Sequence, residues 1–159
     1  MHVADVGAGT GLFTRLFSQQ VGSRGWVFAV DISPRFAEHL AELADRIRGQ
    51  NITPVLCAAD SVLLPPESVD IVYICDTYHH FEYPAATLAS IHRAMRTGGR
   101  LAVIDLERIP GVSSEWTLDH VRAGKETFRE EIEAAGFELD RELDLDGLVE
   151  NYFLLVRKP

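Results

Sequence analysis

The stretch His2-Val-Ala-Asp-Val-Gly-Ala-Gly-Thr-Gly11 decides the fold of this chain. Its first half, His2–Val6, is a short apolar run with the character of a buried strand, and it stops at glycines. After Gly11, apolar residues recur with helical spacing, at Leu12, Phe13, Leu16 and Phe17. This order of strand, glycine-rich turn and helix predicts a ligand site. Small residues let a ligand approach the backbone, and a helix N-terminus presents free N–H groups.

The rest of the chain repeats the alternation of strand and helix. Further strands are expected at residues 26–30, 52–57, 69–74, 101–104, 137–143 and 152–156. Helices are expected from a Ser33 N-cap with Pro34 behind it to Gly49, from Pro84 through Met95 to the Gly98-Gly99 stop, and from Leu118 to Ala135 with a break at Gly124. Seven strands interleaved with helices predict an α/β domain with a mostly parallel sheet and an antiparallel hairpin of the last two strands at its edge.

Composition narrows the class of protein. The chain has 159 residues, 47% of them apolar, and 15 Lys+Arg against 24 Asp+Glu give a net charge of −9. The apolar content argues against a disordered chain. The excess of acidic residues argues against a protein that binds the nucleic-acid backbone. No apolar run reaches the ~20 residues that span a bilayer, and no basic-then-apolar signal segment opens the chain. We therefore expect one soluble, cytoplasmic domain over residues 1–159, beginning inside its first strand.

The glycine spacing discriminates between ligands. The dinucleotide fingerprint G-x-G-x-x-G would place its third glycine at position 12, which is Leu12, so the motif here is G-x-G-x-G. Asp5 precedes the loop and would be poorly placed against a pyrophosphate, whereas it suits a ligand that carries an ammonium group. An NAD-dependent oxidoreductase is disfavoured on both counts.

Three acids follow three successive strands. Asp5 lies at the end of the first, Asp31 at the end of the second, and Asp60 just after the third. In a doubly wound sheet these strand ends lie side by side, so the three carboxylates are expected to line one crevice. An acid at the position of Asp31 accepts hydrogen bonds from both ribose hydroxyls. Each acid alone is equally consistent with ordinary turn chemistry.

These segments resemble a known family. Val3-Ala-Asp-Val-Gly-Ala-Gly-Thr-Gly11 is similar to motif I of the class I S-adenosylmethionine-dependent methyltransferases. Ala29-Val-Asp-Ile32 resembles the acidic loop after the family's second strand, and Ala58-Ala-Asp-Ser61 resembles its adenine-contacting turn. Val69-Asp-Ile-Val-Tyr-Ile-Cys-Asp76 resembles motif IV. The helix, turn and strand that follow motif IV resemble Ile91-His-Arg-Ala-Met-Arg-Thr-Gly-Gly-Arg-Leu101, where Thr97 replaces the usual Pro. Within this family, the sequence is most similar to the subgroup that methylates small molecules, the methyltransferase type 11/25 domains.

The resemblance implies a fold, a cofactor and a site. The fold is a Rossmann-like, doubly wound, seven-stranded sheet of order 3-2-1-4-5-7-6 with strand 7 antiparallel. The cofactor is S-adenosylmethionine, and the product is S-adenosylhomocysteine. The resemblance assigns the loop Gly7, Ala8, Gly9 and Gly11 to the methionine part, with Asp5 holding the loop and the ammonium. It assigns the ribose to Asp31, the adenine to Ile32, Asp60 and Ser61, and the surroundings of the methyl group to Cys75 and Asp76.

Catalytic groups are expected after the fourth strand, in Asp76-Thr-Tyr-His-His-Phe-Glu-Tyr83. Methyl transfer from a sulfonium is an in-line displacement that mainly needs alignment, with a base only for a protonated, weak acceptor. His79 or His80 is the candidate base, and a structural role for the pair is the alternative. No metal site is expected, because adjacent histidines point apart and no ligand spacing appears. Cys57 and Cys75 are expected to be reduced, because strands two and one separate them.

The segment after the fifth strand is expected to be a solvated amphipathic helix, although this region covers the acceptor in the family. It carries Trp116, His120, Arg122, Lys125 and Glu126 on its polar side and Phe128, Ile132 and Ala135 in the core.

Two functions stay open. The first is a methyltransferase acting on a small-molecule acceptor, without nucleic acid or a membrane span. The second is a cofactor-binding domain that is inactive or depends on a partner, since the family's usual N-terminal lid helices do not precede Met1 in this sequence. A homodimer or a partner that supplies the lid is then expected.

Overall fold

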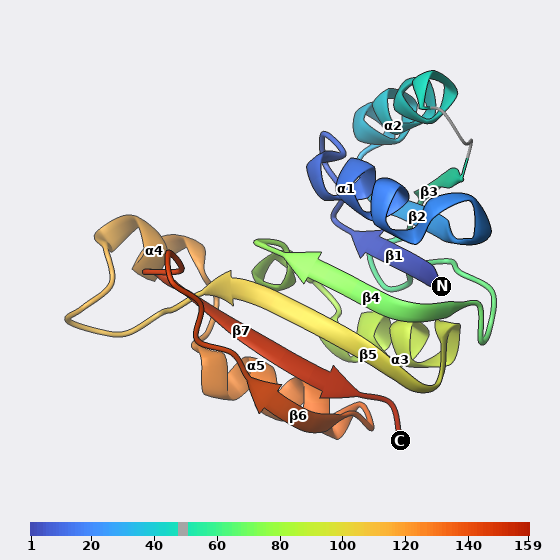
Figure 1. Cartoon of the computed structure of the whole chain (residues 1–159). Helices are drawn as coiled ribbons and strands as arrows, with labels where there is room; N and C mark the ends of the chain where they lie inside the picture. Colours follow the sequence, from blue (N-terminus) through green and yellow to red (C-terminus); the bar gives the residue numbers. More distant parts are fainter. Residues whose placement is uncertain (48–50) are drawn as a thin grey trace.

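The computed structural model describes residues 1–47 and 51–159. The fold is built on a seven-stranded sheet (Figure 1). Its strands are β1 (His2–Val6), β2 (Trp26–Asp31), β3 (Ile52–Leu56), β4 (Val69–Cys75), β5 (Met95–Leu106), β6 (Glu138–Glu142) and β7 (Asn151–Arg157). Their order is β3-β2-β1-β4-β5-β7-β6. The first five strands pair in parallel, and β7 runs antiparallel to both β5 and β6. The predicted α/β fold and strand order are confirmed.

The helices lie in the predicted segments of the chain. They are α1 (Leu12–Val21), α2 (Pro34–Arg46), α3 (Pro84–Ala94), α4 (Glu115–His120) and α5 (Lys125–Ala134), with 3-10 turns η1 (Gly22–Arg24) and η2 (Tyr78–His80). However, α3 ends early, and α4 begins at Glu115, before the predicted start at Leu118. Gly124 is the N-cap of α5, so the predicted break is confirmed. Ser33 is the N-cap of α2 and Pro34 its first residue, as predicted. The predicted helix end at Gly49 lies outside the described residues. In the described part of the chain, no helix combines the length and the apolar character needed to cross a bilayer.

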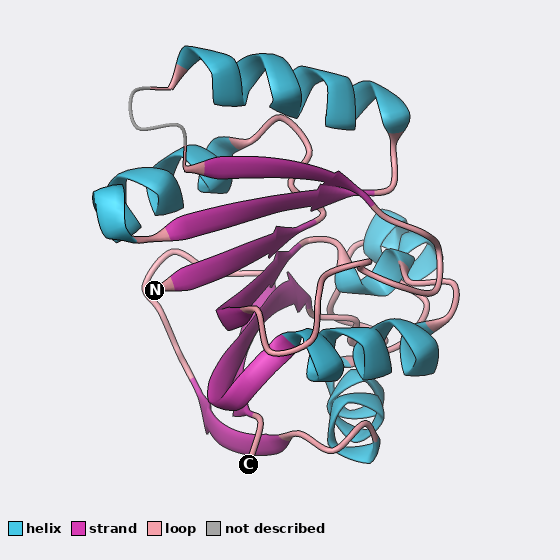
Figure 2. Cartoon of the chain, turned by 90° about the vertical axis from the view of Figure 1, so that its right-hand side faces the viewer, coloured by secondary structure: helices cyan, strands magenta, loops and turns pink. Residues whose placement is uncertain are grey.

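Two apolar layers sandwich the sheet, because successive strand residues point to opposite faces. Val27 and Ala29 of β2 belong to a small cluster with Leu40 of α2, against which Phe17 and Val21 of α1 pack. Val30 belongs instead to a larger cluster on the other face, together with buried residues of α3 and α5 (Leu88, Ile91, Ala94, Phe128 and Ile132). Figure 2 shows the sheet edge-on between its helices. The predicted core role of Phe128 and Ile132 is confirmed, and Ala135 packs against the same cluster.

The third predicted helix ends earlier than expected. The sequence pattern carries it through Met95 to Gly98-Gly99, but α3 ends at Ala94 and Met95 begins β5. Met95 has extended backbone angles and pairs with Val69, the first residue of β4. Its side chain is fully buried, so the residue keeps its core role from within a strand. The apolar spacing cannot distinguish these two placements of the same buried residue.

The glycine loop between β1 and α1 requires glycine at Gly7 for two separate reasons. Its φ of +76° lies in the left-handed region, which costs a side chain about 1–2 kcal/mol. A Cβ at this position would also overlap the side chain of Thr77, which follows β4. The N–H groups of Gly7 and Ala8 both donate to the carbonyl of Val30, at 2.9 and 3.1 Å. The loop therefore contacts the end of β2 through Val30 and the residue Thr77 that follows β4.

Gly98 provides a matched reference for Gly7, because it has a φ of +77° and no atom within 4 Å of a built Cβ. We expect Gly98→Ala to lower the free energy of unfolding by about 1–2 kcal/mol, from the backbone angle alone. Gly7→Ala should lower it by a further ~1–3 kcal/mol, because Thr77 must move. Urea denaturation of both variants measures the difference. Equal losses for the two variants would show that the contact with Thr77 does not constrain the loop.

Candidate active site

A cavity of about 470 Å³ opens at the carboxyl ends of β1, β2 and β3, beside η2. Strand order reverses between β1 and β4, and such a switch point is where open α/β sheets bind ligands. The volume is that of a small-molecule site. The lining residues are Val6, Gly7, Gly9, Asp31, Ile32, Phe36, Cys57, Ala58, Ala59, Ser61, Val62, Thr77, His80, Phe81, Glu82 and Thr87. The cavity thus unites the glycine loop with one of the two predicted catalytic histidines.

Asp31 shapes the wall beside the glycine loop. Its Oδ2 accepts a hydrogen bond from the Gly9 N–H at 2.9 Å, and its Oδ1 accepts one from the Ser33 N–H at 2.8 Å. The residue is 7% exposed and lines the cavity. A carboxylate has about four lone-pair sites, so each oxygen still has acceptor capacity for a ligand. The carboxylate therefore orders the loop and remains able to bind hydroxyl groups.

The cavity wall that follows β2 and β3 consists of apolar side chains and a tight turn. Ile32 is 55% exposed and Phe36 is 41% exposed, and both line the cavity. Ala58 and Ser61 form an antiparallel bridge, with the Ala58 N–H donating to the Ser61 carbonyl at 3.0 Å. Asp60 lies within this turn and is exposed.

Asp5 does not line the cavity. It is 3% exposed, and its Oδ2 accepts a hydrogen bond from the Thr14 hydroxyl at 2.6 Å. This bond fastens β1 to α1 beneath the glycine loop. The expectation that three acids line one crevice is thus correct for Asp31 alone, because Asp5 points under the loop and Asp60 stands beside the lining residues Ala59 and Ser61.

Cys75 and Asp76 end β4 but do not line the cavity, and neither do Ala8 and Gly11. Asp76 has a φ of +47° and accepts a hydrogen bond from Asn151 at 2.9 Å. Burial raises the pKa of the Cys75 thiol to about 11, so the thiol stays protonated at neutral pH. Both cysteines of the chain are free, as predicted. A left-handed residue held at a strand end is a form of local strain that concentrates at functional sites.

The two predicted catalytic histidines have different surroundings. His80 is exposed and lines the cavity, and burial together with neighbouring histidines lowers its pKa. The His79 side chain is only 2% exposed, and its Nδ1 lies 2.6 Å from Oδ1 of Asp105. Asp105 is fully buried and also accepts from the N–H groups of His79 and Leu106. A carboxylate thus fixes the orientation of the His79 ring.

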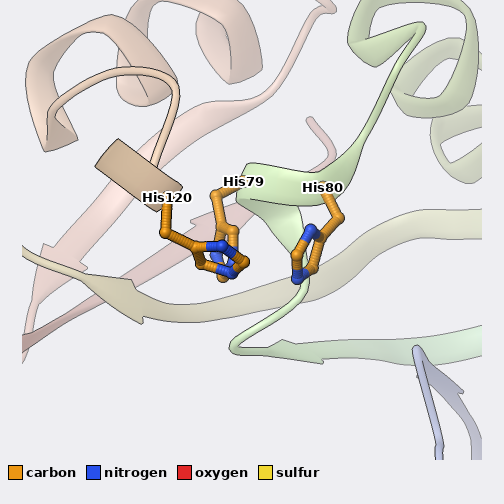
Figure 3. Close-up of side chains that lie close together, drawn as sticks. All are labelled: His79, His80 and His120. Atoms are coloured by element: carbon orange, nitrogen blue, oxygen red, sulfur yellow. The ribbon is translucent and has the colours of Figure 1, made fainter. Parts of the chain in front are cut away.

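The expectation that adjacent histidines point apart is wrong here. The rings of His79 and His80 lie 4.0 Å apart between centroids, because both residues sit on the tight turn η2. His120, at the end of α4, approaches each of them to 5.0 Å (Figure 3). The segment predicted as a solvated amphipathic helix with a break at Gly124 folds as α4 and α5, and the end of α4 places His120 against the pair.

Sequence reasoning missed several residues of this region. Asp105 could have been found, since it follows the predicted fifth strand as Asp31 follows the second. His120 carries no such signal, because its approach to η2 depends on tertiary folding. The lining residues outside the predicted site segments are Phe36, Cys57, Val62 and Thr87, whereas Thr77, Phe81 and Glu82 lie in the stretch that was predicted to hold catalytic groups.

The strand order and a cavity at the switch point define the class: a Rossmann-like α/β domain built to bind a nucleoside ligand. The methyltransferase-domain family matches residues 4–103, and the chain belongs to this family. Family and fold together make S-adenosylmethionine the cofactor, with S-adenosylhomocysteine as product.

Relatives and solved structures agree with this assignment. The Ubiquinone/menaquinone biosynthesis C-methyltransferase UbiE of Methylococcus capsulatus is 32% identical over 111 residues, which are 67% of this chain and 44% of the relative. The chain thus spans less than half the length of the curated relatives it matches.

Among solved structures, an S-adenosylmethionine-dependent methyltransferase from Aquifex aeolicus superposes with a TM-score of 0.87 at 21% identity, over 100% of this chain and 82% of the other. The 4+2 cyclase SpnF superposes with a TM-score of 0.83 at 17% identity, over 99% and 74%. At these identities the structures show the shared fold.

The buried Asp5 predicts a pH dependence. Burial raises its pKa from 3.8 to about 6, against the opposing hydrogen bond from Thr14. Because the folded-state pKa lies above the unfolded one, Asp5 favours folding most below pH ~4, and this contribution is lost as the pH rises to about 6. Asp5→Asn should therefore gain stability relative to the wild type across this range, by up to about 3 kcal/mol.

Urea denaturation of both proteins at several pH values between 4 and 7 measures this gain. Asp45→Asn, an exposed position on α2, is the control and should leave the pH profile unchanged. A difference between Asp5→Asn and wild type that stays constant with pH would refute the raised pKa.

Proposed function

We propose that this chain transfers the methyl group of S-adenosylmethionine to a small-molecule acceptor by in-line displacement. The observation that carries the proposal is the continuity of one cavity, which runs from the glycine loop past Asp31 to His80. A cofactor lying along that cavity has its nucleoside end at β2 and β3 and its other end near η2. Membership of the methyltransferase-domain family supports the same reaction.

The residues that line the cavity fit a cationic nucleoside without phosphate. Asp31 and Glu82 contribute carboxylates, and the lining residues of the described chain include no lysine or arginine. Gly9 presents bare backbone, because a Cβ built there would have no neighbour closer than the Gly7 carbonyl at 4.0 Å. A pyrophosphate would meet the acidic wall without a cationic side chain, whereas a sulfonium with an ammonium group is attracted to it.

In this proposal each predicted cofactor residue keeps a role. Asp31 accepts from the ribose hydroxyls, while Ile32 packs on the adenine and Asp60 with Ser61 binds the adenine edge. The loop residues Gly7, Ala8, Gly9 and Gly11 hold the methionine part. Asp5 acts from beneath that loop, through Thr14. Cys75 and Asp76 border the methyl group at the end of β4.

The cofactor supplies a methyl group that is already activated by its sulfonium. The chain's own residues therefore need to orient the acceptor and handle its proton. Asp105 accepts from the N–H groups of His79 and Leu106, so it acts as an acceptor and leaves the proton on Nδ1 of His79. Nε2 of His79 then presents a lone pair, and the lowered pKa of His80 keeps that ring neutral. His80 lines the cavity and can take a proton from an acidic acceptor hydroxyl, whereas His79 is buried and does not line the cavity.

An aromatic or apolar small molecule is the acceptor that the site favours. Phe81 lines the cavity beside His80, and Trp116 stands exposed on α4 next to His120, at 4.5 Å between ring centroids. The UbiE relatives are C-methyltransferases of ubiquinone and menaquinone biosynthesis, and this supports an aromatic ring as acceptor. A cytoplasmic location and a homodimer or lid-supplying partner stay predictions.

Asp60→Asn tests the cofactor assignment cleanly, because Asp60 is exposed and its loss should not disturb the fold. We expect it to weaken binding of S-adenosylhomocysteine about 10-fold, since the charged carboxylate that accepts from the adenine amine is replaced by a neutral amide oxygen, which is a weaker acceptor. Isothermal titration calorimetry measures the affinity, with Asp45→Asn as the matched surface control. An unchanged affinity in Asp60→Asn would contradict the placement of adenine at the Ala58–Ser61 turn.

Methyl transfer itself is tested with methyl-labelled S-adenosylmethionine and a panel of phenols and hydroquinones. Label in the organic product is the expected result. Tight binding of S-adenosylhomocysteine without transfer to any acceptor would instead favour the inactive or partner-dependent domain.

A further inference from the structure

Three imidazole rings converge beside the end of the cavity. His79 and His80 come from η2 and His120 from the end of α4, and Figure 3 shows the three rings gathered together. One ring nitrogen of each residue lies within 4.8 Å of the others. The segments that carry these rings are about forty residues apart in the sequence, so only the fold assembles the cluster.

His79 contributes the most informative atom. Its Nδ1 is engaged by Asp105 at 2.6 Å, while its Nε2 is buried and has no hydrogen-bond partner among the described atoms. A buried polar atom without a partner is unfavourable, so native sites usually supply a partner at such a position. A histidine whose other ring nitrogen donates to a carboxylate is also the usual arrangement of a metal ligand, because the carboxylate fixes the tautomer and raises ligand basicity.

The charges around the cluster favour a bound cation. The fully buried Asp105 carboxylate lies next to His79, with its Oδ1 2.6 Å from Nδ1 of that ring. The three imidazoles place one ring nitrogen each within 4.8 Å of one another. Neutral imidazoles keep the lone pairs that a metal ion requires.

We propose that His79 Nε2, His80 and His120 form a binding site for a divalent transition-metal ion of the zinc class. Imidazole nitrogens suit zinc, copper, nickel and iron, whereas magnesium and calcium take oxygen ligands. Three protein ligands leave a fourth position for water or an acceptor oxygen. His80 also lines the cofactor cavity, so this open position lies at the acceptor end.

The geometry needs a small adjustment. Ligand nitrogens around tetrahedral zinc lie about 3.3 Å apart, from Zn–N distances of about 2.0–2.1 Å. The observed separations of up to 4.8 Å close by shifts of the exposed His80 and His120. His120 is on α4, a helix of six residues, and its ring stacks on the exposed Trp116. His79 stays fixed by Asp105.

Metal binding changes how the two predicted catalytic histidines act. A ring nitrogen that ligates an ion cannot take a proton, so His79 and His80 become ligands in the metal-loaded protein. The ion lowers the pKa of a bound water or acceptor hydroxyl in place of the side-chain base. This catalytic consequence rests on the proposed function, whereas the binding of the ion does not.

The test is titration of the chelator-treated, full-length chain with Zn²⁺ by isothermal titration calorimetry, and with Co²⁺ by visible absorption. We expect one Zn²⁺ per chain and the intense absorption of four-coordinate Co²⁺. The variants are His120→Gln and His80→Gln, which change exposed side chains and should leave the fold intact by circular dichroism. Each should weaken Zn²⁺ binding at least 100-fold. His39→Gln, an exposed histidine on α2 outside the cluster, should bind as the wild type does.

Several results would overturn the site. These are absence of one-to-one binding in the wild type, equal affinity in wild type and His120→Gln, or an equal loss in His39→Gln. Binding of S-adenosylhomocysteine to the same samples separates the two proposals. In the wild type, binding of the cofactor without binding of Zn²⁺ contradicts only the metal site, and binding of Zn²⁺ without binding of the cofactor contradicts only the proposed function.

Discussion

The carboxylate of Asp31 is the point on which the site depends. It receives the N–H of Gly9 from the loop after β1 and the N–H of Ser33 from the start of α2, at 2.9 and 2.8 Å. Because parallel strands end at one edge of the sheet, a single side chain at the end of β2 can connect both segments. Its two donors are backbone groups that carry no full charge, so its negative charge remains available to a cationic ligand. The shape and the polarity of the cavity both follow from this residue.

The two ends of the cavity serve different chemistry. At one end, the backbone of Gly9, the Asp31 carboxylate and apolar side chains line the cavity, and the lining residues of the described chain include no cationic side chain for a phosphate. At the other end, Asp105 orients His79, and His80 and His120 complete a cluster of basic nitrogens. The excess of acidic residues argued against nucleic-acid binding, and two of these acidic residues have specific positions around the cavity. One carboxylate orders the cofactor end, and another supports the imidazoles at the acceptor end.

The fold was largely predictable from the sequence, because strand and helix periodicities are local and the motif order matches a known family. Gly124 and the Ser33-Pro34 pair marked their helix ends correctly. Met95 was misplaced, since a buried apolar residue fits either the end of α3 or the start of β5. The direction of the Asp5 side chain and the approach of His120 to η2 were beyond sequence reasoning. Both depend on how distant elements pack, and no spacing along the chain records that.

The central claim is that the cavity holds a cationic, phosphate-free nucleoside. Isothermal titration of the wild-type chain with S-adenosylmethionine, S-adenosylhomocysteine and NAD tests it most directly. The account predicts saturable one-to-one binding of the first two compounds and none of NAD. Binding of NAD without binding of S-adenosylmethionine would contradict it.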